Sequence, residues 1–452
     1  MTDTIYALAS GAGRAGVAVV RVSGPHAGDA LSGLSGAGLP EPRTAKMARI
    51  THPQTNETLD DALVLWFPGP ASFTGEDVAE LHIHGGRAVI DGVLAALSGV
   101  HGLRLAEPGE FTRRAFTHGK LDLTQVEGFA DLIEAETEAQ RRQALRQSEG
   151  ELGRLYDGWR ERLVRALAHF EAELDFSDEE LPEHLHAAVL DQVRDLRGHV
   201  QAHLADGRRG ERLRDGIRLA IIGPPNAGKS SLMNVLAQRE AAIVSPQAGT
   251  TRDVVEVHLN LGGYPLLVAD TAGLRDSGDA VESEGVRRAK AWAEGADLKL
   301  ALFDGEALPD FDFETRALLD AETIVAVNKA DTLDAALHGT PDQVDGYPVL
   351  VLSVKSGAGL DALLDQLTVR VAERCQAASE GPAPTRARHR ESLQRTEQAL
   401  GRFLARDTVE LVGAELEAED LRLAARELGR ITGRVDVEDL LDVIFRDFCI
   451  GK

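Results

Sequence analysis

Apolar and polar positions follow three different patterns along the chain, and each pattern predicts a different kind of structure. Residues 1 to about 120 mix short β-like apolar runs with turns rich in glycine and proline, which predicts an α+β domain. These runs are Gly16–Val22, Ala62–Phe67 and Val78–Ile83. From about Leu121 to Arg212, leucines and a tryptophan recur every three, four or seven residues with Arg, Glu and Gln between them. That spacing predicts amphipathic helices packed on one another.

Between Gly216 and about Cys375, short β-rich runs alternate with glycine loops and helical stretches. The runs are Ile217–Ile222, Leu266–Ala269, Leu298–Phe303, Thr323–Val327 and Val349–Leu352. This alternation predicts a mostly parallel sheet covered on both faces. After a linker rich in proline and alanine, charged helical texture returns, so the sequence predicts one helical domain split by an inserted α/β domain. The predicted ranges are 1–120 for the N-terminal domain, 121–212 and 378–452 for the two parts of the helical domain, and 213–377 for the insert.

The composition narrows the range of functions. Lys and Arg number 49 against 73 Asp and Glu, which gives a formal net charge of −24. Non-specific binding to nucleic acid or to an anionic membrane needs a surplus of cations, so we do not expect it here, although a local basic groove is compatible with this charge. Aromatic residues make up 4% of the chain, which disfavours a base-stacking surface for single strands.

Cysteine usage and hydropathy indicate a cytoplasmic protein. The two cysteines, Cys375 and Cys449, form no disulfide framework, which fits a reducing compartment. No stretch approaches the roughly 18 uninterrupted apolar residues of a membrane span. The N-terminus lacks the charged start and long apolar run of a secretory signal.

The segment Gly223–Ser230 reads GPPNAGKS and fits the pattern G-x-x-x-x-G-K-[ST]. It follows the predicted strand Ile217–Ile222 directly and precedes a helical run. Glycines let backbone N–H groups turn inward around phosphates, and the helix directs the positive end of its dipole at them. Lys229 would then reach the β and γ phosphates, and Ser230 would bind Mg²⁺. The alternative is an incidental glycine loop.

Three further motifs follow in the order of a guanine-nucleotide-binding domain. Asp270-Thr271-Ala272-Gly273 ends an apolar run, where the carboxylate can hold Mg²⁺ through water and the glycine N–H can meet the γ-phosphate. Asn328-Lys329-Ala330-Asp331 ends another, and Asp331 can accept hydrogen bonds from the N1–H and exocyclic amine of guanine. Ser353-Val354-Lys355 follows a third run, where a backbone N–H can contact the guanine oxygen. Together these motifs predict a Ras-like P-loop G domain that selects GTP over ATP.

The residues that activate water are harder to identify. The position after Asp-x-x-Gly, which carries a water-orienting Gln in Ras-type GTPases, is Leu274 and has no polar atoms in its side chain. Acidic candidates follow it at Asp276, Asp279, Glu282 and Glu284, although most acidic residues in such a segment are solvated helix-start charges.

Charge that develops on the phosphate oxygens also needs a cation. Arg252 and Arg275 are available, or Asn226 can bind a monovalent ion through its side-chain oxygen. Thr251, in the Gly-Thr-Thr segment between the first two strands, is our candidate for a further Mg²⁺ ligand that closes onto the γ-phosphate.

The segments GPPNAGKSSLMN, GTTRD, DTAGLR and NKAD together resemble the Era/TrmE group of bacterial GTPases. The flanking segments GEDVAELHIHGG, EPGEFTRRAFTHGKLDLTQVEG and the terminal FCIGK resemble the MnmE (TrmE) family of tRNA-modification GTPases. This resemblance covers essentially the whole chain. It implies K⁺-stimulated GTP hydrolysis, with G domains that dimerise across the nucleotide. Ser353-Val354-Lys355 departs from the commoner Ser-Ala-Lys, which affects only the detail of the base contact.

The resemblance also implies roles for individual residues. Glu282 matches the water-orienting glutamate and would act in catalysis with Lys229 and Thr251. The expected K⁺ ligands are Asn226, Ser245, Gln247 and Thr250. The residues expected to bind GTP are Asn226, Ala227, Gly228, Lys229, Ser230, Ser231, Ser245, Pro246, Gln247, Ala248, Gly249, Thr250, Thr251, Asp270, Thr271, Ala272, Gly273, Asn328, Lys329, Asp331, Ser353 and Lys355.

The N-terminal domain resembles a folate-binding module that also forms the homodimer. The matching formyl-tetrahydrofolate residues are Arg21, Glu80, Lys120 and Lys452. Arg and Lys can pair with folate carboxylates, and a carboxylate can accept from pterin N–H groups. Without the resemblance, Arg21 and Glu80 would read as ordinary strand-edge charges. Cys449 matches the family's tail cysteine, and its alternative is a small buried residue.

Two histidines alternate on the strand that carries Glu80. His82 and His84 lack further ligands in the sequence, so we interpret both as structural.

Members of this family work with an FAD-containing partner, MnmG (GidA), in a heterotetramer that adds an aminomethyl-type group to C5 of the wobble uridine of certain tRNAs. The resemblance implies this reaction, and composition does not. An Era-like GTPase of ribosome assembly is the main alternative, and it predicts a basic RNA-binding appendage. A membrane-remodelling GTPase would need a basic amphipathic helix or an apolar paddle, and the sequence has neither.

Overall fold

A computed structural model gives the structure of the chain. It describes residues 3–11, 13–175, 185–239, 256–270, 295–333, 342–375, 381–405, 414–435, 438–446, 448 and 450–451. These residues form two compact units, and each is described by itself. The first unit contains residues 1–130, 147–161 and 425–452, and the second contains 131–146 and 162–424.

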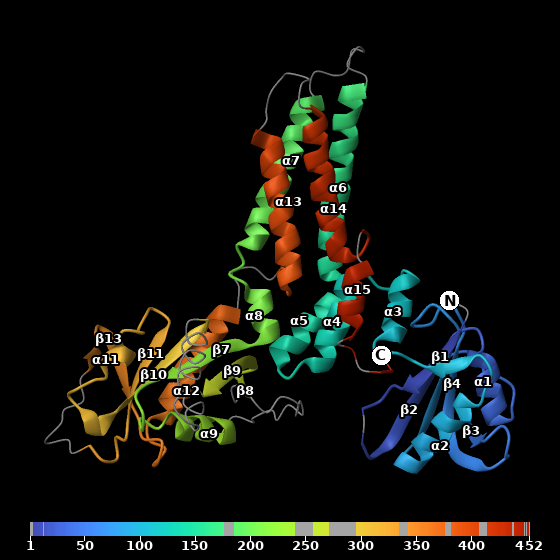
Figure 1. Ribbon diagram of the computed structural model, residues 1–452, viewed down its shortest axis with the longest axis horizontal. Coiled ribbons are helices and arrows are strands. Elements are labelled where there is room, and N and C mark those ends of the chain that lie inside the picture. The colour runs from blue at the N-terminus through green and yellow to red at the C-terminus, as the bar shows by residue number, and fades with distance from the viewer. Residues whose placement is uncertain are drawn as a thin grey trace, which may run out of the picture. The chain divides into compact units, whose positions relative to one another are not determined.

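The first unit is built on a six-stranded, mostly antiparallel sheet in the order β3-β4-β5-β2-β1-β6 (Figure 1). Its strands are β1 (Thr4–Leu8), β2 (Ala15–Ser23), β3 (Lys46–Thr51), β4 (Thr58–Phe67), β5 (Val78–Gly85) and β6 (Leu103–Leu105). In the second half of β4, fully buried positions alternate with more exposed ones, because one face of this strand points into the core. Helices α1 (Ala27–Ser35) and α2 (Arg87–Ser98) cover that face and share its apolar core.

The second unit contains a seven-stranded sheet in the order β12-β13-β11-β10-β7-β9-β8. Its strands are β7 (Ile217–Ile222), β8 (Glu256–Leu261), β9 (Tyr264–Asp270), β10 (Leu298–Asp304), β11 (Thr323–Asn328), β12 (Gln343–Val344) and β13 (Tyr347–Val351). The central strands pair in parallel. All six residues of β11 are buried, as a strand covered on both faces requires. Alternate residues of β10 point to two separate cores, one of which includes α9 (Lys229–Arg239) and α12 (Leu360–Cys375).

The other helices of the described chain range from short to long. They are α3 (Glu110–Thr117), α4 (Leu123–Glu134), α5 (Glu138–Ser148), α6 (Glu151–Asp175), α7 (Leu185–Leu204), α8 (Arg209–Asp215), α13 (Ala387–Ala405), α14 (Ala414–Thr432) and α15 (Glu438–Arg446), with the short η1 (Gly305–Ala307) and α11 (Phe313–Arg316) in the sheet unit. Helices α7 and α13 run side by side (Figure 1), and Arg197 pairs with Glu397 between them at 2.8 Å. The expected architecture is confirmed: an α+β N-terminal module, long helices and an inserted parallel sheet. The four predicted domain ranges stay predictions.

The beginning of α5 packs on the inserted sheet although it precedes the insert by about 80 residues. Ala139 is buried within the core of that sheet, and its N–H donates to Gly263 O at 3.1 Å. Thr137 and Gln140 cap the helix reciprocally, and the Gln140 amide also donates to the carbonyl of Arg214 at 2.9 Å. Apolar periodicity does not reveal such a contact, because it depends on tertiary packing alone.

Candidate functional site

The predicted phosphate loop connects β7 to α9 at the carboxyl end of the parallel sheet, where ligands of such sheets bind. Lys229 is buried, and its Nζ donates to the carbonyls of Gly223 at 2.7 Å and Pro224 at 2.8 Å. The ammonium is therefore held against the backbone of its own loop. Ser230 and Ser231 are exposed in the first turn of α9. This turn begins a helix, and a helix start directs backbone N–H groups and the positive end of its dipole toward a phosphate.

Two backbone conformations shape the loop. Asn226 has φ +64° and Gly228 has φ +97°, so both lie in the left-handed region. A Cβ at Gly228 would lie 2.4 Å from Nδ2 of Asn328, which only glycine avoids. The loop therefore needs glycine at 228 for its backbone angle and for its contact with a second motif.

Asn328 ties three loops together. Its Nδ2 donates to Ala227 O at 2.8 Å, and its Oδ1 accepts from the backbone N–H of Val354 at 3.0 Å. The side chain is buried, so both hydrogen bonds are shielded from water. The phosphate loop, the Asn-Lys-Ala-Asp motif and the Ser-Val-Lys motif thus form one connected site, although about 130 residues of chain separate its ends.

Asp331 is oriented by the third motif. The fully buried Ser353 hydroxyl donates to Asp331 Oδ1 at 2.6 Å, and this hydrogen bond lowers the pKa of the Asp331 carboxyl. Lys355 is 3.8 Å from the other carboxylate oxygen and is 87% exposed. Asp331 is therefore a fixed anion that can accept hydrogen bonds, as recognition of the guanine edge requires.

Two carboxylates that no sequence motif indicated also belong to this site. Lys329 Nζ donates to Asp304 at 2.7 Å and to Glu306 at 3.1 Å. Asp304 is the last residue of β10, and Glu306 lies in the turn η1 that follows it. Register is the signal that identifies them, because Asp304 pairs with Asn328 across the parallel strands β10 and β11.

Several predicted site residues lie outside the residues that the structure describes, and their roles stay predictions. They are Ser245, Pro246, Gln247, Ala248, Gly249, Thr250, Thr251, Thr271, Ala272, Gly273 and Glu282. Of Asp270 only the backbone is described, and it pairs with Ile221 across β9 and β7. The strand thus brings Asp270 to the same sheet edge as the phosphate loop.

The predicted folate residues Arg21 and Glu80 face each other across β2 and β5. The Arg21 Nε donates to Glu80 Oε1 at 3.0 Å, and the two side chains are only 23% and 17% exposed. The Arg21 guanidinium also lies 5.7 Å from the centre of the Phe73 ring and 5.8 Å from that of Phe111. The pair is thus a sheltered, oriented charge pair beside aromatic surface.

Lys120 contacts the same loop as Arg21. Its Nζ donates to Pro70 O at 3.0 Å, and Pro70 and Phe73 both belong to the loop between β4 and β5. The C-terminal tail also reaches this sheet, since Ile450 bridges to Pro108 and a Cβ at Gly451 would lie 2.0 Å from Leu8 O. Lys452 and Cys449 lie outside the described residues.

The two histidines of β5 have structural partners. His82 Nε2 lies 3.3 Å from Glu80, and His84 Nδ1 lies 2.8 Å from Asp60. Among the described residues, no group of three or more His, Cys, Asp or Glu side chains is placed to hold a metal ion.

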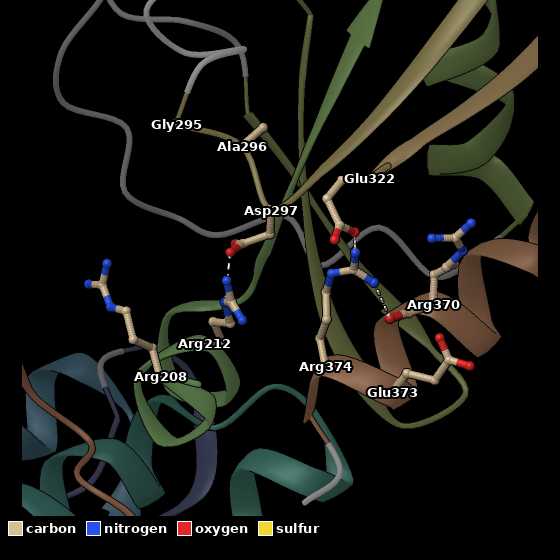
Figure 2. A pocket seen from close by; sticks show the side chains of 9 residues that line it. All are labelled: Arg208, Arg212, Gly295, Ala296, Asp297, Glu322, Arg370, Glu373 and Arg374. Carbon is tan, nitrogen blue, oxygen red and sulfur yellow. Dashed lines mark hydrogen bonds and ion pairs between the residues drawn. The ribbon is translucent and has the colours of Figure 1, made fainter. Parts of the chain in front are cut away.

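A cavity of about 560 Å³ lies at the opposite sheet edge, between α8, the end of α12 and the starts of β10 and β11 (Figure 2). Arg212 pairs with Asp297 at 2.7 Å, and Arg374 pairs with Glu322. These ion pairs lie where the chain passes into the inserted sheet and out of it again. The cavity is therefore a charged crevice at the two chain connections of the inserted domain, far from the nucleotide loops.

Comparisons with known proteins agree with this geometry. A family model described as the MnmE helical domain matches residues 123–449, and one described as the GTP-binding protein TrmE N-terminus matches residues 4–120. The tRNA modification GTPases MnmE of Paramagnetospirillum magneticum and Parvibaculum lavamentivorans are each 58% identical over all of both chains. The zebrafish (Danio rerio) mitochondrial 5-taurinomethyluridine-[tRNA] synthase subunit GTPB3 is 53% identical over all of this chain and 93% of its own.

None of the helices in the described ranges is both long and apolar enough to cross a membrane. Family models at both ends of the chain, full-length relatives and the joined nucleotide motifs lead to one conclusion. The chain belongs to the MnmE (TrmE) family of tRNA modification GTPases.

Proposed function

We propose that the chain hydrolyses GTP with Mg²⁺ and K⁺ bound, and that this hydrolysis serves the modification of C5 of the wobble uridine in tRNA. The observation that carries the nucleotide part is the double hydrogen bond of Asn328, which joins the phosphate loop to the loops expected to read guanine. A site built in this way binds both ends of one nucleotide. Lys229 would lie against its phosphates and Asp331 against its base.

Two residues with oxygen-bearing side chains support an Mg²⁺ site at the phosphate loop. The Ser230 hydroxyl is exposed at the start of α9, and β9 brings the backbone of Asp270 to the same edge. A hydroxyl and a carboxylate are ligands that Mg²⁺ prefers. We assign Ser230 and Thr251 as direct ligands, and Asp270 as a ligand through water. When bound, the ion offsets charge on the β and γ phosphates.

The remaining catalytic groups follow from the family resemblance. Asn226 is exposed at the rim of the loop, so its amide oxygen suits a monovalent cation there. Ser245, Gln247 and Thr250 would complete the K⁺ site. Glu282 would orient the attacking water, because Leu274 has no polar side-chain atom.

We assign the first unit to a tetrahydrofolate one-carbon donor such as formyl-tetrahydrofolate. Arg21 can pair with folate carboxylates, Glu80 can accept from pterin N–H groups, and Phe73, which is 37% exposed, offers a flat apolar ring beside them. Lys120 and Lys452 would add positive charge. The opposite charges of Arg21 and Glu80 and the exposed ring of Phe73 support this proposal.

A homodimer also fits the first unit. The sheet face opposite α1 and α2 exposes Val17, Met47 and Leu63, and Met47 and Leu63 pair directly across β3 and β4. Exposed apolar side chains on one sheet face favour a second copy of the chain. The G domains would pair separately, across the nucleotide.

The uridine reaction rests on the relatives. One relative is named for 5-taurinomethyluridine in tRNA, a uridine substituted at position 5. We infer the same class of product here, made in a heterotetramer with FAD-containing MnmG. Because this chain is strongly acidic, we expect the partner to supply much of the tRNA contact.

The test combines kinetics with nucleoside analysis. The GTPase rate of the full chain should rise with K⁺ concentration at constant ionic strength, both with and without the flavoprotein. Deletion of the gene should remove the modified wobble uridine, as mass spectrometry of tRNA nucleosides would show. Equal rates in Na⁺ and K⁺ would exclude the potassium role. Unchanged nucleosides together with defective ribosomal particles would favour the ribosome-assembly alternative.

A further inference from the structure

The guanine end of the nucleotide site contains a lysine that two carboxylates hold in place. Lys329 Nζ lies 2.7 Å from Asp304 Oδ2 and 3.1 Å from Glu306 Oε2, and Asp304 is only 16% exposed. Lys329 itself has φ +66°, a backbone conformation that lysine rarely adopts. The side chain and the backbone of this residue are thus both constrained, which is unusual for a lysine at a loop tip.

The turn that supplies the carboxylates packs directly against the Asn-Lys-Ala-Asp loop. A Cβ at Gly305 would lie 2.7 Å from Asn328 O, so the two segments approach as closely as backbone allows. Asp304 Oδ1 accepts the N–H of Glu306 at 3.0 Å and caps η1, while its other oxygen accepts from Lys329. One carboxylate therefore fixes both the turn and the lysine.

The two carboxylates also change what Lys329 can offer a ligand. They raise the pKa of the Lys329 ammonium, chiefly through the hydrogen bond to Asp304. The ammonium is thus satisfied by the protein and directed toward the end of β10. The Lys329 side chain is 28% exposed, so the anchored side chain stays partly accessible to a ligand.

We propose that Asp304 and Glu306 are positioning residues for the guanine nucleotide: they anchor Lys329 so that its stem forms a preformed wall of the base pocket. They set how tightly the nucleotide binds, while Asp331 sets which base is accepted. This inference rests on the assignment of Asp331 to the guanine edge. An anchored wall improves affinity because its side-chain entropy is lost before the ligand arrives.

The first test is Asp304→Asn in the full chain, measured as the dissociation constant of a fluorescent GDP analogue. Asparagine keeps an oxygen to cap η1 but removes the charge that holds Lys329. We expect affinity to fall about tenfold, as loss of a sheltered ion pair plus reordering of one lysine implies. The ratio of the affinities for GTP and xanthosine triphosphate (XTP) should stay unchanged, because Asp331 sets the base preference. Glu306→Gln, which leaves the cap intact, should cost about threefold because Glu306 is 54% exposed.

A matched control lies at the other end of the same strand. Lys299 and Asp320 also form a 2.7 Å ion pair, with one partner on β10, but far from the nucleotide loops. Asp320→Asn should therefore leave nucleotide affinity unchanged while removing an ion pair of equal length. A general loss of stability would affect both variants, whereas positioning of the nucleotide affects only Asp304→Asn.

A double-mutant cycle shows whether Asp304 acts through Lys329. In a Lys329→Met background, Asp304→Asn should cause no further loss of affinity. Wild-type affinity in Asp304→Asn, or an equal loss in both backgrounds, would overturn the proposal. If Asp331→Asn failed to change base preference, the site assignment itself would be wrong. If Asp331→Asn changed base preference while Asp304→Asn had no effect, only the positioning role would fall.

Discussion

The nucleotide site and the Arg21–Glu80 site differ in how the chain encodes them. The phosphate loop and the loops expected to read guanine are each contiguous motifs, so their residue types and spacing predict what they bind. Asn328 then joins these two halves of the nucleotide site in the folded chain. Arg21 and Glu80 are single residues 59 positions apart, and only the register of two antiparallel strands makes them a pair. Contiguous motifs can therefore be read from a sequence, whereas a site made by strand register is found in the fold or by resemblance.

The first unit contains a second cross-strand ion pair that can be compared with Arg21–Glu80. Arg49 and Asp61 also face each other across neighbouring strands and lie 3.0 Å apart, but they are 66% and 54% exposed. Exposed pairs of this kind contribute little to stability or binding. Burial beside aromatic rings, more than pairing itself, distinguishes Arg21–Glu80 as a candidate site.

The largest effect is expected from Lys229→Met in the phosphate loop. Loss of the ammonium that meets the β and γ phosphates should lower GTP hydrolysis by at least a hundredfold, roughly the cost of removing one transition-state charge contact. Lys355→Met is the matched control, since Lys355 lies in a motif of the same site but is 87% exposed. Steady-state GTPase assays compare the two variants. Equal rates would contradict the assignment of Lys229 to the β and γ phosphates.

Gly228→Ala should affect the joint between the two halves of the nucleotide site. The added Cβ would lie 2.4 Å from Asn328 Nδ2 and would force φ +97° on an alanine. We expect nucleotide affinity to fall by at least tenfold and the melting temperature to drop by several degrees, as backbone strain of a few kcal/mol implies. Gly33→Ala in α1, where no atom lies within 4 Å of the new Cβ, should be neutral or stabilising. Unchanged affinity in Gly228→Ala would show that the loops are not joined as described.

Arg21→Gln tests the site made by strand register. We expect formyl-tetrahydrofolate to bind about tenfold more weakly, because one sheltered charge-assisted contact is lost. Titration calorimetry on the full chain measures this, so that Lys452 is retained. Arg49→Gln should bind folate like the wild type, and an equal loss in both variants would assign the effect to the sheet as a whole.

The smallest effect concerns Cys375. Burial, with the nearby negative charge of Asp297, raises the pKa of its thiol to about 12, so only about one molecule in ten thousand is thiolate at pH 8. We expect iodoacetamide to leave Cys375 unmodified in the native chain and to modify it after unfolding, as peptide mass spectrometry would show. Rapid native labelling of Cys375 would contradict its buried placement.

Much of the inserted sheet could be predicted from the sequence because parallel strands buried on both faces appear as continuous apolar runs. The run Ile217–Ile222 coincides with β7, and Leu298–Phe303 and Thr323–Val327 each fall one residue short of β10 and β11. Strand β8 (EVHLNL) has a polar residue at every second position, and such an edge strand is not distinguished by an apolar run.

The residues that could not be predicted from the sequence take their roles from tertiary contacts. Asp304 and Glu306 follow a strand that was predicted, yet nothing in their spacing shows that they hold Lys329. Ala139 joins the core of the inserted sheet from a helix that periodicity assigns to the helical domain. Both contacts arise only when segments distant in sequence pack together.

We infer that Asp331, oriented by Ser353 in a site that Asn328 joins to the phosphate loop, selects guanine, and a single variant is enough to test this role. Turnover of GTP and XTP should be compared for the wild-type chain and for Asp331→Asn. The asparagine amide can donate to the oxygen that replaces the guanine amine in xanthine. We expect the preference of Asp331→Asn to move from GTP to XTP while its melting temperature stays near that of the wild type. An unchanged preference for GTP in that variant would contradict it.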